Sequence, residues 1–396
     1  MSIPGADLLL ELRWESAHAT HSDRLFVAAA NPAADRFPGR LADALRDRGP
    51  GTVAEEAFAP GQLVPAYDEG KVLVIQPGQF RSRLADGQEV PPRAGRFYPC
   101  RLLQGVPGAG PRDLRPFRVL EVAPDAIRVD LNHPLARYPV RLEARMLPES
   151  GARAPSGARD IAQLVTSGGP GLQAEMQVGE TDFRSGEPYA RPDAAPDGDF
   201  YRAPRLVSHL DDTALAGLRS LYGRFLQPGT KVLDLMASWD SHLPAAEGVR
   251  VTGLGLNREE LERNPLLAER VVHDLNAEPR LPFPDGAFDL ALCTVSVEYL
   301  TRPEEVLREV GRTLRPGAAF VATFSERWFP PKVVRIWTEL HPFQRMELVL
   351  DWLWRAGRFA GLASESLRGL PRPAGDRYAA ALLHSDPLYA VWGRRA

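Results

Sequence analysis

Three polar side chains in the second half of the chain stand where a ligand-binding enzyme needs them. Asp234 lies in Val-Leu-Asp-Leu, an apolar run typical of a buried strand, and Asn257 and Asp274 each follow another strand-like run. Ligands of open parallel sheets bind beyond the carboxyl ends of the strands, where the strand order reverses. Carboxylate and amide groups at that edge can hydrogen-bond to hydroxyl and amine groups. A ligand site is therefore expected at that edge of the sheet.

The elements that would position these side chains alternate between strands and helices. Strands are expected where short apolar runs occur, and helices where apolar residues recur every three or four positions. The expected strands are 231–235, 249–254, 271–272, 288–294 and 319–324, with two more near 363–367 and 388–393, and the expected helices are 206–225, 257–269 and 303–314. Such alternation is typical of an α/β domain with a doubly wound parallel sheet.

Residues 281–317, LPFPDGAFDLALCTVSVEYLTRPEEVLREVGRTLRPG, resemble the class I S-adenosylmethionine-dependent methyltransferases of the kind called methyltransferase type 11. The shared features are a proline-flanked loop, Phe-Asp at the start of a strand, a Leu-Arg-Glu-Val helix and Arg-Pro-Gly before the next strand. The resemblance implies a Rossmann-like fold over residues 200–396. It also implies a methyltransferase of unspecified substrate, with S-adenosylmethionine as its cofactor.

The same resemblance implies roles for individual residues. Asp234 matches the acidic residue of the first motif, and Asp274 matches the acid that faces the adenine amine. The family's glycine-rich loop is replaced by the run 236–240 (MASWD), and the acid that holds the ribose hydroxyls falls on Gly255, so Asn257 is expected to bind the ribose instead. The cofactor-binding residues implied in this way are Asp234, Ser238, Asn257, Asp274, Leu275 and Thr294.

No catalytic base is evident, although methyl transfer from a sulfonium depends mainly on proximity and alignment. Polar residues after the fourth and fifth expected strands are candidates for the substrate mouth: Thr294, Ser296, Glu298, Tyr299, Ser325, Glu326 and Arg327. Trp337, Trp352 and Trp354 are expected in core or lid packing. The missing glycines leave a second hypothesis open, a non-catalytic binding protein in which Met236 or Trp239 fills the cofactor pocket.

The first half of the chain resembles the FK506-binding-protein (FKBP) type of prolyl isomerase, of the bacterial SlyD kind. The run 127–136 (IRVDLNHPLA) carries this resemblance, and the alternating run 138–146 supplies the strand that follows it. The resemblance implies an α+β FKBP-like domain. The family's Phe-Asp pair of the proline pocket has no counterpart after Trp14, so a binding module is favoured over a folding helper with isomerase activity. Asn132 is expected to take left-handed geometry in a turn, and His133 to be structural.

These resemblances and the composition divide the chain into an FKBP/SlyD-like domain (1–147), a Gly/Pro-rich linker (148–199) and a methyltransferase-like domain (200–396). The net charge of −3 and the pI of about 6.3 exclude the strongly basic surface of a nucleic-acid-binding domain. No signal peptide or membrane span is expected. Cys100 and Cys293 lack metal-ligand spacing, so reduced thiols in a cytoplasmic protein and no metal are expected. The substrate, a small molecule or a protein, and the oligomeric state are not specified.

Overall fold

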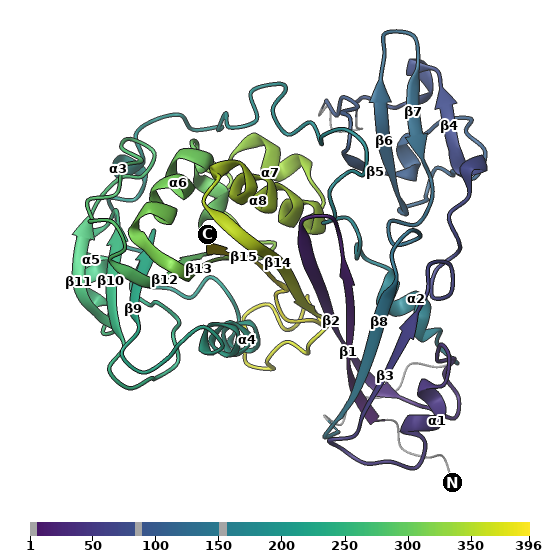
Figure 1. Ribbon diagram of the computed structural model, residues 1–396, viewed down its shortest axis with the longest axis horizontal. Helices are drawn as coiled ribbons and strands as arrows, with labels where there is room; N and C mark the ends of the chain where they lie inside the picture. Colours follow the sequence, from purple (N-terminus) through teal and green to yellow (C-terminus); the bar gives the residue numbers. More distant parts are fainter. Residues whose placement is uncertain (1–5, 84–88, 150–156) are drawn as a thin grey trace. The chain divides into compact units, whose positions relative to one another are not determined.

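The computed structural model describes residues 6–83, 89–149 and 157–396 (Figure 1). It consists of two compact units. The N-terminal unit comprises Met1–Ser185 with Glu339–Glu347, and the C-terminal unit comprises Gly186–Thr338 with Leu348–Ala396. Within the described part of the chain, no helix is both long and apolar enough to cross a membrane.

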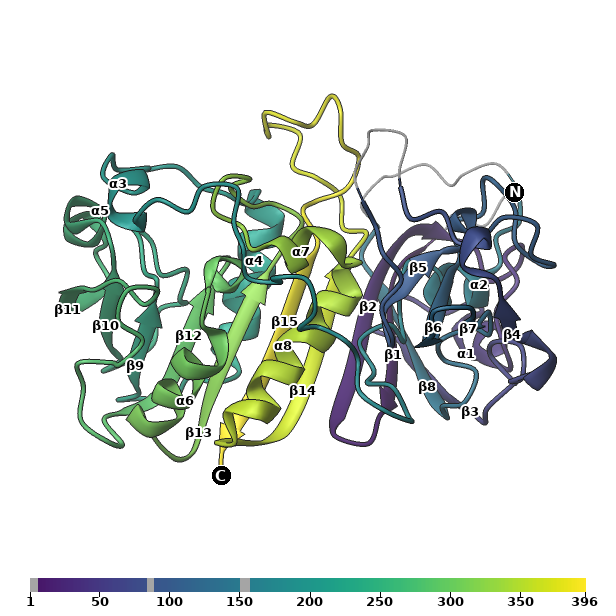
Figure 2. The same cartoon turned by 90° about the horizontal axis from the view of Figure 1, so that it is seen from above.

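The sheet of the C-terminal unit has the strand order β11-β10-β9-β12-β13-β15-β14, which can be followed in Figure 2. Its strands are β9 (Lys231–Leu235), β10 (Arg250–Gly255), β11 (Leu267–Val272), β12 (Phe288–Thr294), β13 (Leu314–Phe324), β14 (Phe359–Arg368) and β15 (Leu388–Arg395). Strands β9 to β13 pair in parallel, whereas β15 is antiparallel to both of its neighbours. The order reverses between β9 and β12, which is where such sheets bind ligands.

Helices cover both faces of this sheet, with α4 on the opposite face from α6 and α8 (Figures 1 and 2). The helices are α3 (Asp197–Phe200), α4 (Asp212–Gly223), α5 (Arg258–Arg263), α6 (Pro303–Thr313), α7 (Arg335–Glu339) and α8 (Pro342–Ala356), with a 3₁₀ turn η4 (Val297–Tyr299). The apolar face of α4 is buried in the same core as the strand residues Val232, Leu290 and Val321. Trp337 and Trp352 are fully buried as expected, but Trp354 is half exposed.

Two expected helices have different ends in the structure, and both differences have local causes. The helix expected over 257–269 ends at Arg263, and β11 begins at Leu267. Asn264 is extended and precedes Pro265, and the residue before a proline is disfavoured in a helix. The helix expected over 206–225 begins only at Asp212. The Asp211 side chain caps it there by accepting a hydrogen bond from the backbone amide of Ala214, the third residue of the helix.

The N-terminal unit contains two antiparallel sheets, each with its own apolar core. One has the order β2-β1-β8-β3 and the other β4-β7-β6-β5. The strands are β1 (Ala6–Glu15), β2 (Ala19–Ala30), β3 (Val53–Phe58), β4 (Val72–Ile75), β5 (Phe97–Pro99), β6 (Pro116–Val122), β7 (Ile127–Asp130) and β8 (Val140–Leu147). Short helices are α1 (Leu41–Leu45), α2 (Ile161–Thr166), η1 (Glu69–Lys71), η2 (Pro77–Gln79) and η3 (Cys100–Leu102).

The Asn-His-Pro turn before β8 is held by side-chain hydrogen bonds. Asn132 does not have the positive φ that was expected of it; its side chain instead accepts from the Asp68 amide and donates to the Asp68 carbonyl, each at 2.9 Å. The His133 ring lies 3.3 Å from the Thr166 carbonyl and accepts from the Leu135 amide. Burial lowers the pKa of His133. Both residues are therefore structural parts of this turn.

A buried ion cluster ties the loop between β14 and β15 to the start of α4. Arg372 contacts Asp211 at 3.3 Å and Asp386 at 2.7 Å, and all three side chains are less than a tenth exposed. Asp211 also accepts from the amide of Asp386 at 2.6 Å and from the Ser385 hydroxyl at 2.8 Å. Burial alone would raise the pKa of Asp211, but these bonds outweigh it and hold the pKa below its usual value. The cluster thus fixes the chain next to residues 209 and 210.

Replacing Arg372 with Met should lower the free energy of unfolding by about 3–5 kcal/mol, since it leaves the buried Asp211 carboxylate without a cation, whereas Asp386 keeps its ion pair with Arg327 at 2.9 Å. Arg250→Met is the matched control, because Arg250 is two-thirds exposed and lies 4.0 Å from its partner Glu269. Exposed pairs contribute at most about 1 kcal/mol. Urea unfolding at pH 7 measures both variants, and equal losses would contradict a structural role for the cluster.

Candidate functional site

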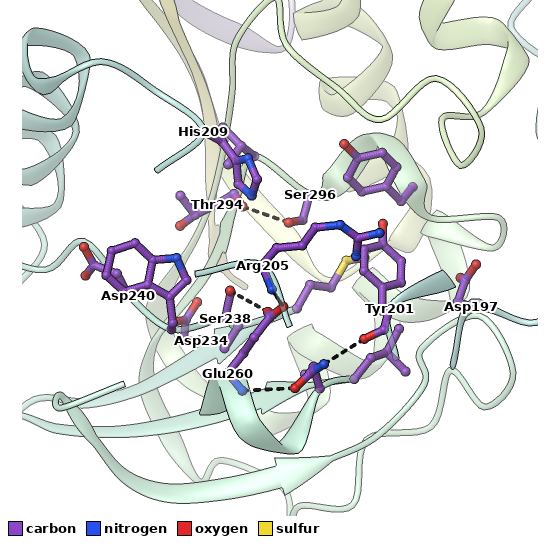
Figure 3. A pocket seen from close by; sticks show the side chains of 18 of the residues that line it. Asp197, Tyr201, Arg205, His209, Asp234, Ser238, Asp240, Glu260, Thr294 and Ser296 are labelled. Carbon is purple, nitrogen blue, oxygen red and sulfur yellow. Dashed lines mark hydrogen bonds between the residues drawn. The ribbon is translucent and has the colours of Figure 1, made fainter. Parts of the chain in front are cut away.

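A cavity opens at the carboxyl ends of β9, β10 and β12, where the strand order reverses (Figure 3). Its volume is about 1120 Å³ with the space open to solvent included. Six residues predicted from the sequence line it: Asp234, Ser238, Asn257, Asp274, Leu275 and Thr294. Segments spread over sixty residues of the chain are thereby brought together in one site.

The loop after β9 contains no glycine, yet one of its residues has a backbone conformation that favours glycine. Met236 has a φ of 55°, in the left-handed region that side chains other than glycine seldom adopt. The backbone amide of Ala237 donates to the Leu254 carbonyl at 2.8 Å. The side-chain amide of the buried Asn264 donates to the Ser238 carbonyl and to the Ser241 hydroxyl, both at 2.9 Å. These bonds hold the strained turn against the cavity.

The end of β10 has no room for a carboxylate. A Cβ atom at Gly255 would lie 2.2 Å from the Ala237 carbonyl oxygen, which is backbone and cannot swing aside. The loop that replaces the glycine-rich loop therefore excludes the acid expected in the family at this position.

Glu260 supplies a carboxylate from the first turn of α5 instead. It is nearly buried and lines the cavity, where it accepts from the Ser238 hydroxyl at 2.6 Å and from the Arg205 amide at 2.7 Å. Asn257 caps the same helix by accepting from the Glu260 amide at 3.0 Å, and its side-chain amide donates to the Tyr201 carbonyl at 2.8 Å. Sequence reasoning missed Glu260 as a site residue, although an Asn followed three residues later by Glu is the spacing of a capping box, which directs the Glu side chain toward the start of its helix.

Asp274 lies in a turn fixed by its own carboxylate. One of its oxygens accepts from the Asn276 amide at 2.9 Å and from the Ala277 amide at 3.2 Å. The Asn276 side chain donates to Asp197 at 2.8 Å and to the Tyr299 carbonyl at 2.9 Å. The turn after β11 is therefore joined both to the segment before α4 and to the segment after β12.

The mouth of the cavity contains part of the polar set expected there. Thr294, Ser296 and Tyr299 line the cavity, whereas Glu298, Ser325, Glu326 and Arg327 are not among its lining residues. The Thr294 hydroxyl lies 2.6 Å from the Tyr222 hydroxyl, and Val295 has a φ of 41°. A β-branched residue with positive φ is a strained conformation of the kind that clusters at functional sites.

The sequence that forms this cavity is similar to that of known proteins. A family profile described as "Methyltransferase domain" matches residues 238–322. The "Ubiquinone/menaquinone biosynthesis C-methyltransferase UbiE" of Laribacter hongkongensis is 27% identical over 189 residues, which are 43% of this chain and 76% of that protein. The protein of the same description from Burkholderia mallei (strain SAVP1) is 30% identical over 172 residues, 39% of this chain and 68% of that protein. The chain belongs to the class I S-adenosylmethionine-dependent methyltransferases.

Among solved structures, a "SAM dependent methyltransferase" from Archaeoglobus fulgidus aligns with a TM-score of 0.34 and 16% identity over 46% of this chain and 94% of that one. As a member of this family, the present chain has S-adenosylmethionine as its cofactor. The cavity fits such a ligand, because carboxylates of two segments, Glu260 and Asp274, line it together with hydroxyl and amide groups. Met236 and Trp239 line the cavity and leave it open, and the Trp239 indole N–H donates to the Val207 carbonyl at 3.3 Å.

Ionisation in the site is set by burial. Burial raises the pKa of Asp234 to about 7, although the Ser241 hydroxyl acts in the opposite direction. A hydrogen bond from His242, at 2.9 Å, lowers the pKa of Asp240. Within the described ranges, no three His, Cys, Asp or Glu side chains are grouped so that they could hold a metal ion.

Asp234→Asn should make the protein progressively more stable than the wild type as the pH rises. The pKa of Asp234 in the folded protein, about 7, is above its usual value of 3.8, so charging this carboxyl opposes folding. Its contribution to stability is complete below pH 4 and is lost as the pH rises through 7. The difference between the two proteins should grow by about 4 kcal/mol across this window. Urea unfolding between pH 4 and 8 measures it, and a constant difference would contradict the assignment.

Proposed function

We propose that the chain transfers the methyl group of S-adenosylmethionine to an acceptor bound in the cavity of the C-terminal unit. The observation that carries this proposal is the meeting of the six predicted residues in one cavity at the switch point of the sheet. A scaffold protein with a lost site has no need of a strained turn at Met236 and Val295, since strain persists where the structure and the function require it.

Four residues of the cavity have proposed parts in holding the cofactor. Glu260 would bind the ribose hydroxyls in place of the acid excluded at Gly255, while Asn257 fixes the start of α5. Asp274 would accept from the adenine amine, and Leu275, which is buried, would pack against the base. The bound cofactor supplies an electrophilic methyl group on a sulfonium. The chain's own contribution is to align the two reactants and exclude water, which requires no base at the methyl group.

Isothermal titration with S-adenosylmethionine tests this assignment. The wild type should bind, and Glu260→Ala and Asp274→Ala should each weaken binding at least tenfold, because hydrogen bonds to charged groups contribute about 1.5–3 kcal/mol. Glu262→Ala is the control, since Glu262 is an exposed carboxylate of the same helix that does not line the cavity.

Absence of heat from the wild type at high protein concentration would contradict the proposal. Binding by the wild type that both cavity variants retain would instead contradict the assigned residues. Circular dichroism of each variant confirms that the fold is unchanged.

We further propose that the N-terminal unit is an FKBP-like accessory domain that presents substrate, in a cytoplasmic protein. Support comes from the run Asn132 to Ala136, which leads into β8 beside β1, and from the second sheet inserted between β3 and β8. The two cysteines, both buried and unpaired, fit a reducing compartment.

The full-length protein should not accelerate a proline-limited refolding reaction, because the aromatic and acidic pair of the proline pocket is missing. A refolding assay with a substrate protein that has a cis-proline, with and without the chain at a tenth of the substrate concentration, measures this. Acceleration at that ratio would show that the unit is an active isomerase.

A further inference from the structure

We propose that Arg205 and Tyr201 form a carboxylate-binding subsite in the same cavity, for a ligand whose carboxylate is next to a flat unsaturated group. This proposal rests on the proposed function, since it describes what the methyltransferase cavity binds. The carboxylate has two conceivable sources, the methyl acceptor and the amino-acid end of the cofactor. Both offer a carboxylate, but the cofactor's carboxylate is on a saturated carbon, so the proposal commits to the methyl acceptor and makes the cofactor an outcome of the test.

The Arg205 guanidinium is oriented by aromatic rings. Its central carbon lies 4.5 Å from the ring centre of Phe200, 5.1 Å from that of Phe329 and 5.4 Å from that of Tyr201. One terminal nitrogen donates to the Phe200 carbonyl at 3.0 Å. A guanidinium held in this way is fixed in direction before a ligand arrives. Figure 3 shows Arg205 and Tyr201 next to each other in the cavity.

Two hydrogen-bond donors of this pair are left over. The second terminal nitrogen of Arg205 and the hydroxyl of Tyr201 are buried, and neither has a hydrogen-bond partner in the described structure. Within the same residues, no carboxylate forms an ion pair with Arg205. Burial raises the pKa of Tyr201 well above its usual value, so the hydroxyl stays a donor. Leaving a buried charged donor without an acceptor is costly, and a bound ligand would remove that cost.

The nearest acidic groups of the cavity are already committed to other partners. Asp197 is paired with Arg191 at 2.8 Å and with the fully buried Lys332 at 3.3 Å. Each oxygen of Glu260 accepts one hydrogen bond, from a serine hydroxyl or from the backbone amide of Arg205, so it can still accept from a ligand, but it forms no ion pair with the guanidinium in the described structure. The guanidinium therefore keeps its positive charge for a ligand from outside the chain.

The type of ligand follows from the donors and from the surface around them. A charged and a neutral donor side by side suit the two oxygens of a carboxylate. The Tyr299 and Phe329 rings stack with centres 6.0 Å apart, and the His209 ring meets Phe329 edge-on at 5.3 Å. Burial lowers the pKa of His209 and outweighs the opposing charge of Glu260, with a smaller lowering from Arg205, which keeps this wall uncharged at neutral pH. Flat unsaturated groups pack well against such rings.

Binding of matched probes tests the subsite and separates the two sources. In the first arm, benzoate and its neutral analogue benzamide are titrated into protein saturated with S-adenosylhomocysteine. In the second arm, S-adenosylhomocysteine is compared with 5′-methylthioadenosine, which lacks the amino-acid end. Each ligand is measured on the wild type, Arg205→Met, Arg205→Lys, Tyr201→Phe and the control Arg202→Met, whose side chain is mostly exposed and outside the cavity lining.

Arg205→Met should weaken the carboxylate ligand of one arm at least tenfold, with Tyr201→Phe and Arg205→Lys giving smaller losses. The neutral partner of that arm and the Arg202→Met protein should be unaffected. A loss confined to benzoate supports the acceptor subsite, and a loss confined to S-adenosylhomocysteine overturns it by assigning the two donors to the cofactor. If Arg205→Met does not fold, as judged by circular dichroism, the Lys and Phe variants decide by the same comparison.

Equal affinities for all variants in both arms would overturn the subsite, even if S-adenosylhomocysteine binds and the proposed function stands. If S-adenosylhomocysteine does not bind to the wild type, the proposed function fails. The benzoate titration, repeated without S-adenosylhomocysteine, then still decides the subsite. Weaker benzoate binding by Arg205→Met supports the subsite, and unchanged binding or no binding by the wild type overturns it.

Discussion

The close approach of the Ala237 carbonyl to Gly255 is the constraint on which the rest of the site depends. A single added Cβ atom would lie 2.2 Å from that oxygen, so the loop after β9 and the end of β10 can coexist only if position 255 has no side chain. The loop has no glycine and reaches its path by placing Met236 in the left-handed region. Its position then dictates where a carboxylate can enter the cavity. The carboxylate that lines the cavity is instead five residues further along, at Glu260 in the first turn of α5.

The segment before α4 depends on the same arrangement. The amide of Arg205 and the hydroxyl of Ser238 bind the two oxygens of Glu260, so the shifted carboxylate joins the loop, the helix α5 and the segment that contains Arg205. Buried ions hold the same segment on either side. Asp197 is paired with Lys332 and Arg191 at one end, and Asp211 with Arg372 at the other. The side chains of residues 201–209 thus project from a segment that is fixed at both ends.

The sequence predicted β9, β10 and β12 well because they are apolar runs buried on both faces, as central parallel strands must be. The edge strand β11 is mostly exposed, and only its last two residues were predicted. The family resemblance also implied six residues that line the cavity. Helix ends were less readable: Pro265 stops α5 early and Asp211 delays α4. Glu260, Arg205 and Tyr201 were missed, because their place in the cavity depends on the path of a loop and of a segment without periodicity. The domain boundaries and the FKBP-like assignment remain predictions.

The arginines of the C-terminal unit show why Arg205 differs from a structural residue. The Arg191 and Arg372 side chains are at most 9% exposed, and each is matched by a carboxylate within 3.3 Å. Folding alone therefore supplies a partner wherever a guanidinium is buried for stability, because an unpaired buried charge is so costly. Arg205 is surrounded by rings and has one nitrogen without an acceptor in the described structure. An arrangement that opposes folding and lines a cavity is best explained by a ligand that completes it.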